Sequence, residues 1–362
     1  MARLDEFLAR SDLNVRAKIA NLLGMTTNTT LMMKTQVQLG ASGPTVFPIA
    51  LGCMGMGSTS WYGKSDEAEN IATIHEAIER GVNVLDTGDF YSMGRNELLV
   101  GKALQGRRDK ALLSVKFGLQ RGPGGAAVGY DARPAAVKNA LAHSLSRLGV
   151  DYIDIYRTGL DPNVPIEDTV GAMGDMVKAG YIRYIALSEV GAETVRRAAA
   201  VHPICDVQLE YSLVSRGIES KVVPALADLG IAVTAYGVLS RGLLTGARPQ
   251  AEGDFRAHLP RFESAQENQP LVDALARVAA EKGVTPAQLA IAWVRAQGIA
   301  QGVTMVPTLG ARTRAQLGDV LAALDVSLNA TDVATLEQAM PASAVVGTRY
   351  PEAWLSTIDS EK

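Results

Sequence analysis

The chain has 362 residues, of which 47% are hydrophobic and 20% are charged, and its formal net charge is −3. This length suits one large α/β barrel or two ordinary domains. The charges form no long run of one sign, which argues against nucleic acid or an anionic membrane as a partner. No apolar stretch approaches the roughly 20 residues of a transmembrane helix. The two cysteines, Cys53 and Cys205, do not suggest a disulfide framework, so we expect a reducing, cytoplasmic location.

The first 30 residues differ in pattern from the rest of the chain. Leu4, Phe7 and Leu8 recur at helical spacing, and acidic residues interrupt the continuous apolar core that a secretory signal needs. We expect residues 1–30 to be a short helical extension and residues 31–362 to be the main domain. The extension is either an oligomerisation or docking element or a segment outside the barrel that is partly disordered or misassigned at the start codon. The main domain is expected to fold without it.

Hydrophobic periodicity predicts the fold class. Residues 34–47 alternate apolar and polar side chains around a Gly-Ala-Ser-Gly turn, which predicts a β-hairpin. Short apolar runs then predict buried strands over residues 49–52, 82–86, 111–116, 152–156, 182–188, 206–209, 231–236 and 303–307. Helical patterns cover residues 67–80, 134–148, 166–179, 193–202 and 221–229, with two more between 271 and 297. Eight strand–helix units predict an α/β fold, a (β/α)₈ TIM barrel with an N-terminal hairpin.

Ionisable side chains stand at the ends of neighbouring predicted strands. Asp86 ends the second barrel strand, Lys116 ends the third, and Tyr91 lies on the loop after Asp86. Barrel active sites lie at the carboxyl ends of the strands, so these side chains are expected to converge. A free Tyr has a pKa of about 10, which a neighbouring ammonium would lower. A carboxylate would in turn keep the Lys charged in a dry site, so the pattern predicts a proton-transfer centre.

The segment from Asp86 to Glu97, D-T-G-D-F-Y-S-M-G-R-N-E, resembles the catalytic signature of the aldo-keto reductases. Lys116 stands where that family keeps its catalytic lysine, and the resemblance extends from about Lys34 to the C-terminus. It implies an oxidoreductase that interconverts an aldehyde or ketone and its alcohol by hydride transfer, with Tyr91 as the proton donor. The implied partner is therefore a small carbonyl or alcohol compound. We expect no metal, and an oligomer is left open.

Residues 235–246, A-Y-G-V-L-S-R-G-L-L-T-G, resemble the family's pyrophosphate-binding loop. By that resemblance Tyr236 stacks on the nicotinamide. The backbone of residues 237–242 contacts phosphate, since glycine-rich backbone lets N–H groups approach an anion. Ser188 and Gln208 match positions that hold the nicotinamide carboxamide, and Glu189 stands where many members have Asn.

Residues 306–320 resemble the family's loop and short helix after the eighth strand. Arg312 and Gln316 fall where the adenosine 2′-phosphate and ribose are bound, Asp319 falls where adenine is contacted, and Val320 replaces a usual Asn. Guanidinium groups match a phosphate dianion, so Arg312 and Arg314 favour NADP over NAD. The full set expected to bind NADP(H) is Gly52, Ser188, Glu189, Gln208, Tyr236, Gly237, Val238, Leu239, Ser240, Arg241, Gly242, Gly310, Arg312, Gln316 and Asp319.

One departure concerns a His that the family carries after the fourth strand, in a pattern like D-L-Y-x-x-H-R-x-D-P. Residues 154–162 read D-I-Y-R-T-G-L-D-P, without a His and one residue shorter. Arg157 or Thr158 is a candidate replacement donor, and an outward or structural role is the alternative. Loss of one preorganised donor can cost ~10²–10³ in rate, which favours a slow or specialised reductase. The competing hypothesis is a cofactor-binding regulatory subunit or redox sensor on the same barrel.

Trp61 and Tyr62 lie on the loop after the first predicted strand. Aromatic side chains there would wall a substrate pocket and favour an apolar or ring-bearing carbonyl compound. The alternative is a loop that packs only on its own neighbours.

Overall fold

A closed barrel of parallel strands forms the centre of the computed structural model, which describes residues 36–57, 61–249 and 254–362. The expected helical extension, residues 1–30, lies outside this part of the chain. Around the barrel, neighbouring strands follow the order β10-β11-β12-β3-β4-β5-β8-β9. The strands are β3 (Ala50–Gly52), β4 (Val84–Gly88), β5 (Leu112–Phe117), β8 (Ile153–Thr158), β9 (Ile182–Ser188), β10 (Ile204–Glu210), β11 (Ala232–Tyr236) and β12 (Met305–Gly310).

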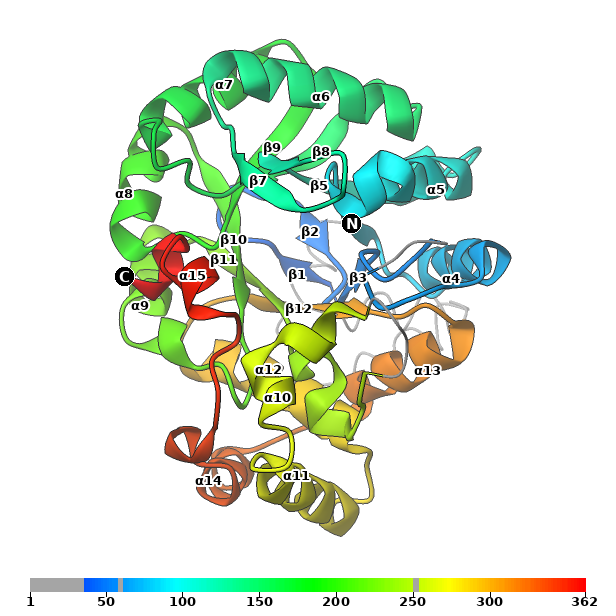
Figure 1. Ribbon diagram of the computed structural model, residues 1–362, viewed down its shortest axis with the longest axis vertical. Coiled ribbons are helices and arrows are strands. Elements are labelled where there is room, and N and C mark those ends of the chain that lie inside the picture. The colour runs from blue at the N-terminus through cyan, green and yellow to red at the C-terminus, as the bar shows by residue number, and fades with distance from the viewer. Residues whose placement is uncertain (1–35, 58–60, 250–253) are drawn as a thin grey trace, which may run out of the picture.

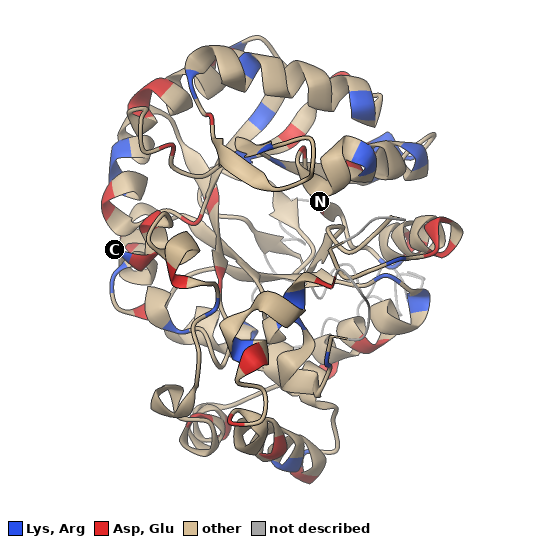
Figure 2. Cartoon of the chain, in the orientation of Figure 1, with Lys and Arg blue, Asp and Glu red and all other residues tan. Residues whose placement is uncertain are grey.

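Helices surround the barrel, as Figure 1 shows, and charges of both signs are spread over their outer faces (Figure 2). Helix α12 begins with Thr285 as its cap and Pro286 in its first turn, as the sequence predicts. None of the helices in the described ranges combines the length and apolar character needed to cross a membrane. The helices are α4 (Glu67–Glu79), α5 (Arg95–Ala103), α6 (Pro134–Leu148), α7 (Ile166–Lys178), α8 (Ala192–Val201), α9 (Val222–Leu229), α10 (Pro260–Glu263), α11 (Gln269–Glu281), α12 (Pro286–Ala300), α13 (Arg314–Ala322), α14 (Ala330–Ala339) and α15 (Glu352–Leu355).

The predicted barrel is confirmed, with every strand and helix predicted between residues 49 and 307 present and only the ends shifted. The N-terminal hairpin is also confirmed and is short, with β1 (Val37–Gln38) pairing antiparallel to β2 (Thr45–Val46). A second hairpin, β6 (Leu119–Arg121) with β7 (Ala127–Tyr130), was not predicted. Its sequence is rich in glycine and has few β-branched residues, so it carries no strand periodicity. This hairpin follows β5 and therefore lies at the end of the barrel that carries the candidate site.

The barrel interior holds four charges that balance one another. Asp86, Lys116, Arg157 and Asp206 are all less than 8% exposed. Arg157 Nη1 lies 2.6 Å from Asp206 Oδ1, and Arg157 Nε lies 4.0 Å from Asp86 Oδ2. The outward role considered for Arg157 is therefore wrong, because its side chain points into the barrel and pairs with acids on β4 and β10. An isolated ion there would be costly, so each charge depends on its partner.

Replacement of Asp206 by Asn should lower the free energy of unfolding by about 3–5 kcal/mol, because it leaves the buried Arg157 guanidinium without its nearest carboxylate. Equilibrium urea unfolding measures this change. Glu167→Gln is the matched control, since it breaks an exposed pair with Arg197 and should change stability little. Equal losses in the two variants would contradict the argument.

Candidate active site

The structure brings Asp86 and Lys116 together at the ends of β4 and β5. The Lys116 ammonium donates to Asp86 Oδ1, while Ser114 Oγ and Gln208 Nε2 donate to Asp86 Oδ2 at 2.9 and 3.0 Å. Burial lowers the pKa of Lys116, and the neighbouring Asp86 carboxylate opposes that shift. The carboxylate therefore holds the ammonium in place and favours its charged form, as the sequence predicts.

Tyr91 lies on a short 3₁₀ turn after β4, η1 (Tyr91–Gly94), and is 7% exposed. Lys116 Nζ lies 5.1 Å from the centre of the Tyr91 ring, so the two groups interact across the face of the ring. Burial raises the pKa of Tyr91 well above 10, and Asp86 adds to the rise. This direction is opposite to the one expected from the sequence. A phenol of ordinary pKa already keeps its proton at neutral pH, so this shift leaves Tyr91 protonated and makes it a weaker acid.

The polar residues expected to hold the nicotinamide carboxamide make contacts within the protein. Gln208 donates to Asp86, as described above, and Ser188 ends β9 beside it in the strand register. Glu189 has a left-handed backbone (φ 56°) and accepts a hydrogen bond from the Glu210 backbone N–H at 2.9 Å. Its other carboxylate oxygen lies 2.5 Å from Arg349 Nη2. Both carboxylate oxygens of Glu189 therefore already have a partner within the protein, the Arg349 guanidinium and the Glu210 backbone N–H.

The loop after β11 turns sharply where the sequence predicts phosphate binding. Gly237 and Gly242 have φ values of +67° and +96°, and Ser240 and Arg241 between them are also left-handed. Ser240, Arg241 and Gly242 are thus three consecutive left-handed residues, and the N–H groups of Ser240 and Gly242 donate to the carbonyls of Gly237 and Leu239 at 2.7 and 2.9 Å. The Arg241 side chain is turned inward, 2.8 Å from Glu210 Oε2, and its guanidinium also donates to the Tyr350 hydroxyl.

The end of β12 offers a cation for a phosphate group. No carboxylate among the described residues lies within ion-pair distance of Arg312, whose side chain packs on Gly55 and donates to the Tyr62 carbonyl at 3.4 Å. Arg314, by contrast, pairs with Glu69 at 2.9 Å. Gln316 accepts from the Arg312 backbone N–H, and Asp319 accepts from Gln288. Arg312 therefore has no close carboxylate partner in the described part of the chain, and Asp254 interacts with it only at longer range.

The aromatic residues expected to line the substrate pocket form a cluster. The rings of Trp61 and Tyr62 each lie 5.3 Å from the ring of Phe255, which is on the turn η5 (Phe255–His258). The guanidinium of Arg121 lies 4.6 Å from the Trp61 ring, so the unpredicted hairpin reaches the same cluster. His258 is on η5 but is exposed. The cluster is therefore shared by segments far apart in sequence.

The C-terminal segment, residues 346–362, covers part of the candidate site, which was not predicted from the sequence. Arg349 contacts Glu189 and donates to the Tyr236 hydroxyl at 3.2 Å, and the Tyr350 hydroxyl lies 3.2 Å from the same Tyr236 oxygen. Asp359 accepts from the Gly191 backbone N–H at 2.7 Å. In Figure 1 this red segment, with α15, crosses the ends of β10 and β11. Residues expected to meet the nicotinamide are thus in contact with the end of the described chain.

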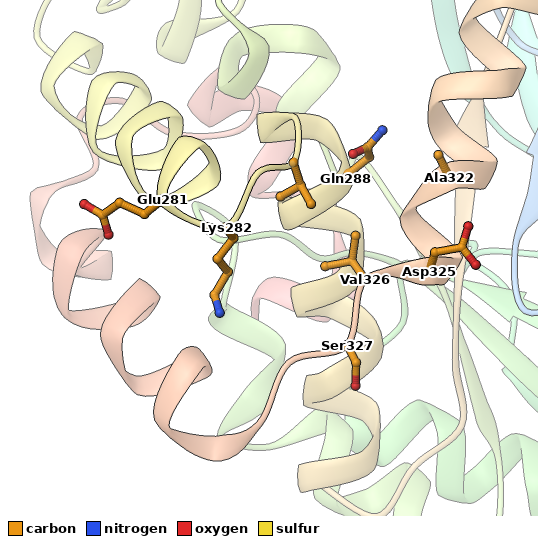
Figure 3. A pocket seen from close by; sticks show the side chains of 8 residues that line it. Glu281, Lys282, Gln288, Ala322, Asp325, Val326 and Ser327 are labelled. Carbon is orange, nitrogen blue, oxygen red and sulfur yellow. The ribbon is translucent and has the colours of Figure 1, made fainter. Parts of the chain in front are cut away.

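Two surface hollows lie away from the proposed catalytic group. One, of about 570 Å³, is bounded by the ends of α11 and α13 and the start of α12 (Figure 3). Another, of about 1110 Å³, lies under the C-terminal segment. Neither of these two hollows is lined by Asp86, Tyr91 or Lys116.

Comparison with known proteins agrees with this arrangement. A sequence model of the Aldo/keto reductase family matches residues 48–341. "Probable aldo-keto reductase 1" of Glycine max is 37% identical over 322 residues, 87% of this chain and 91% of the relative. Among solved structures, aldo-keto reductase AKR11C1 from Bacillus halodurans in its holo form has a TM-score of 0.71 at 28% identity, covering 85% of this chain and 97% of that one. The glycerol dehydrogenase AKR11B4 from Gluconobacter oxydans has a TM-score of 0.74 at 26% identity, covering 84% and 94%.

The chain belongs to the aldo/keto reductase family. Its members are oxidoreductases that act on small carbonyl compounds with a nicotinamide cofactor. The resemblance read from residues 86–97 and the TIM-barrel fold are both confirmed.

Asp89, two residues before Tyr91, has an unusual environment. Burial, and then the neighbouring Glu97 carboxylate, raise its pKa from the ordinary 3.8 to about 7. Its Oδ1 atom is buried without a hydrogen-bond partner among the described residues. The folded protein therefore binds a proton that the unfolded chain releases at lower pH.

Asp89→Asn should stabilise the protein relative to wild type at pH 8 and not at pH 4. Between about pH 4 and pH 7 the folded state holds more protons than the unfolded state, so wild-type stability falls as pH rises through that window. Asn has no proton to release, so the variant does not lose stability over this pH window. Thermal unfolding across the pH range checks the trend, with the exposed Asp151→Asn as control. A difference that does not depend on pH would contradict the assignment.

Proposed function

We propose that this protein is an NADP(H)-dependent reductase of aldehydes or ketones, with Tyr91 as the proton donor. The observation that carries the proposal is the buried contact of Asp86 with Lys116, beside a protonated Tyr91 phenol. The proposed setting is the cytoplasm, and the proposed substrate has an apolar or ring-bearing body, in keeping with the cluster of Trp61, Tyr62 and Phe255.

In this mechanism the bound cofactor would supply a hydride to the carbonyl carbon. Tyr91 gives its hydroxyl proton to the carbonyl oxygen, so that the carbonyl becomes an alcohol and Tyr91 becomes a phenolate. The Lys116 ammonium stabilises that negative charge from across the ring, and Asp86 keeps the ammonium oriented. Proton uptake from solvent then restores Tyr91. The low exposure of the three groups keeps water away from the charges and strengthens their interaction.

Arg312 supports NADP(H) as the cofactor. In the described chain its guanidinium has no carboxylate within ion-pair distance and interacts with Asp254 only at longer range, and a 2′-phosphate would supply a close negative charge. Ser188, Gln208 and Tyr236 would hold the nicotinamide end, and the backbone of residues 237–242 would hold the pyrophosphate. Because Arg349 and Tyr350 already contact Tyr236, these residues are proposed to border the same site.

Arg312→Ala should weaken NADPH binding by about 1.5–3 kcal/mol, or roughly tenfold to a hundredfold, because a charged hydrogen bond is lost. NADH lacks the 2′-phosphate, so its affinity should stay the same. Fluorescence titration with each cofactor measures both dissociation constants. Arg314→Ala is the matched control and should have a smaller effect, since Arg314 already pairs with Glu69. Equal affinities of the wild type for NADPH and NADH would refute the NADP assignment.

Tyr91→Phe should reduce turnover by about 10²–10⁴ while NADPH affinity stays nearly unchanged, because the phenol meets the carbonyl oxygen and not the adenosine. Lys116→Met should be almost as harmful. The measurement is single-turnover NADPH oxidation with a panel of aldehydes and ketones. A Tyr91→Phe enzyme as fast as wild type would direct attention to Tyr62 as the acid. A wild type that binds NADPH without oxidising it would favour a regulatory subunit or redox sensor.

A further inference from the structure

The space that a His would fill beside the catalytic group is occupied by another side chain. Counting from Asp154, the position of the His in the family pattern falls on Gly159. A Cβ atom at Gly159 would lie 3.1 Å from the Ser188 carbonyl oxygen and 3.3 Å from the hydroxyl oxygen of Tyr130. The phenol of Tyr130 therefore takes the volume into which a side chain at residue 159 would extend.

The ring of Tyr130 reaches this position across a second glycine. Tyr130 ends β7 of the unpredicted hairpin, and Gly118 follows β5 directly. A Cβ atom at Gly118 would lie 2.4 Å from Tyr130 Cε1, and the Gly118 φ of +111° also disfavours any other residue. Gly118 and Gly159 thus leave room for the Tyr130 ring on both sides. The two glycines directly follow the strands that carry Lys116 and Arg157.

The Tyr130 hydroxyl joins the ends of these two strands. It donates to the Phe117 carbonyl at 2.8 Å, accepts from the Gly159 backbone N–H at 2.6 Å and lies 3.0 Å from Thr158 Oγ1. Phe117 and Thr158 are partners in the register of β5 and β8, one residue beyond the pair of Lys116 and Arg157. A single oxygen atom therefore fixes the backbone of both strands immediately after the residues that carry the buried charges.

We propose that Tyr130 is a positioning residue for the reduction, which replaces the missing imidazole by linking the ends of β5 and β8 and so holding Lys116 in register with Asp86 and Tyr91. This proposal rests on the proposed reductase function. Because the hydroxyl proton of Tyr130 is donated to Phe117, the residue acts through the strand ends and not on the substrate. The carbonyl oxygen then receives its proton from Tyr91 without help from an imidazole at residue 159.

The kinetic test compares Tyr130→Phe with Tyr211→Phe. Both changes keep a buried ring and remove a bonded hydroxyl, since Tyr211 donates to Glu219 and accepts from Gln301. Tyr130→Phe should lower kcat roughly tenfold, because small displacements of a catalytic group are costly, while the KM for the carbonyl and the NADPH dissociation constant stay within about twofold. Tyr211→Phe should leave kcat unchanged. A kcat within about twofold of wild type in Tyr130→Phe, or the same fall in both variants, would overturn the proposal.

A second test measures packing and needs no turnover. Gly159→His, Tyr130→Ala and the double variant are compared by thermal unfolding. An imidazole at residue 159 and the phenol of Tyr130 would overlap in space. Gly159→His should therefore lower the unfolding temperature clearly when Tyr130 is present and much less when it is introduced together with Tyr130→Ala. If the shifts in unfolding temperature of the two single variants simply add in the double variant, the proposal is overturned. If the shifts do not add but the protein oxidises no NADPH, only the reductase function is overturned.

Discussion

The fold and the chemistry of this protein depend on one constraint, the pairing of two cations with two carboxylates inside the barrel. Asp86, Lys116, Arg157 and Asp206 come from four different strands and are almost free of solvent. An unpaired ion in such a place costs far more than any single packing contact stabilises, so the strands must meet in a register that pairs all four. The same register places Lys116 beneath the Tyr91 ring. The strand register that closes the barrel is therefore the same register that brings the proton-transfer group together.

Strand ends and loops contribute to the site in different ways. The charged group is carried by strand ends, whose position is fixed by the barrel, and this precision is what proton transfer requires. The cofactor loop, the aromatic cluster and the C-terminal segment are added around it. Contacts among these added parts are mostly polar, such as Arg349 with Glu189 and Arg241 with Tyr350. The charged pairs among them, such as Arg349 with Glu189 and Arg241 with Glu210, are poorly exposed, so breaking one without a replacement partner would be costly.

The sequence was sufficient for the features that depend on local pattern. Apolar runs of strand length marked the barrel, and charged residues at the ends of those runs marked Asp86 and Lys116 as neighbours. Features set by distant contacts were missed. Nothing local shows that residues 349 and 350 return to β9 and β11, or that a glycine-rich stretch after β5 forms a hairpin. Arg157 and Asp206 did carry a signal, because a charge inside an apolar strand must have a buried partner. The pKa of Tyr91 could not be predicted, since it depends on how deeply the phenol is buried.

Glu210 joins three segments that are far apart in the sequence. This one buried carboxylate is bound by Arg241, Arg261 and Arg349, which belong to the loop after β11, to α10 and to the C-terminal segment. Loss of its charge would leave three poorly exposed guanidinium groups without their common partner, and such groups are costly to bury unpaired. The position of the C-terminal segment over the barrel therefore depends on a carboxylate that ends a barrel strand, so a change at that strand end would be felt in all three segments at once.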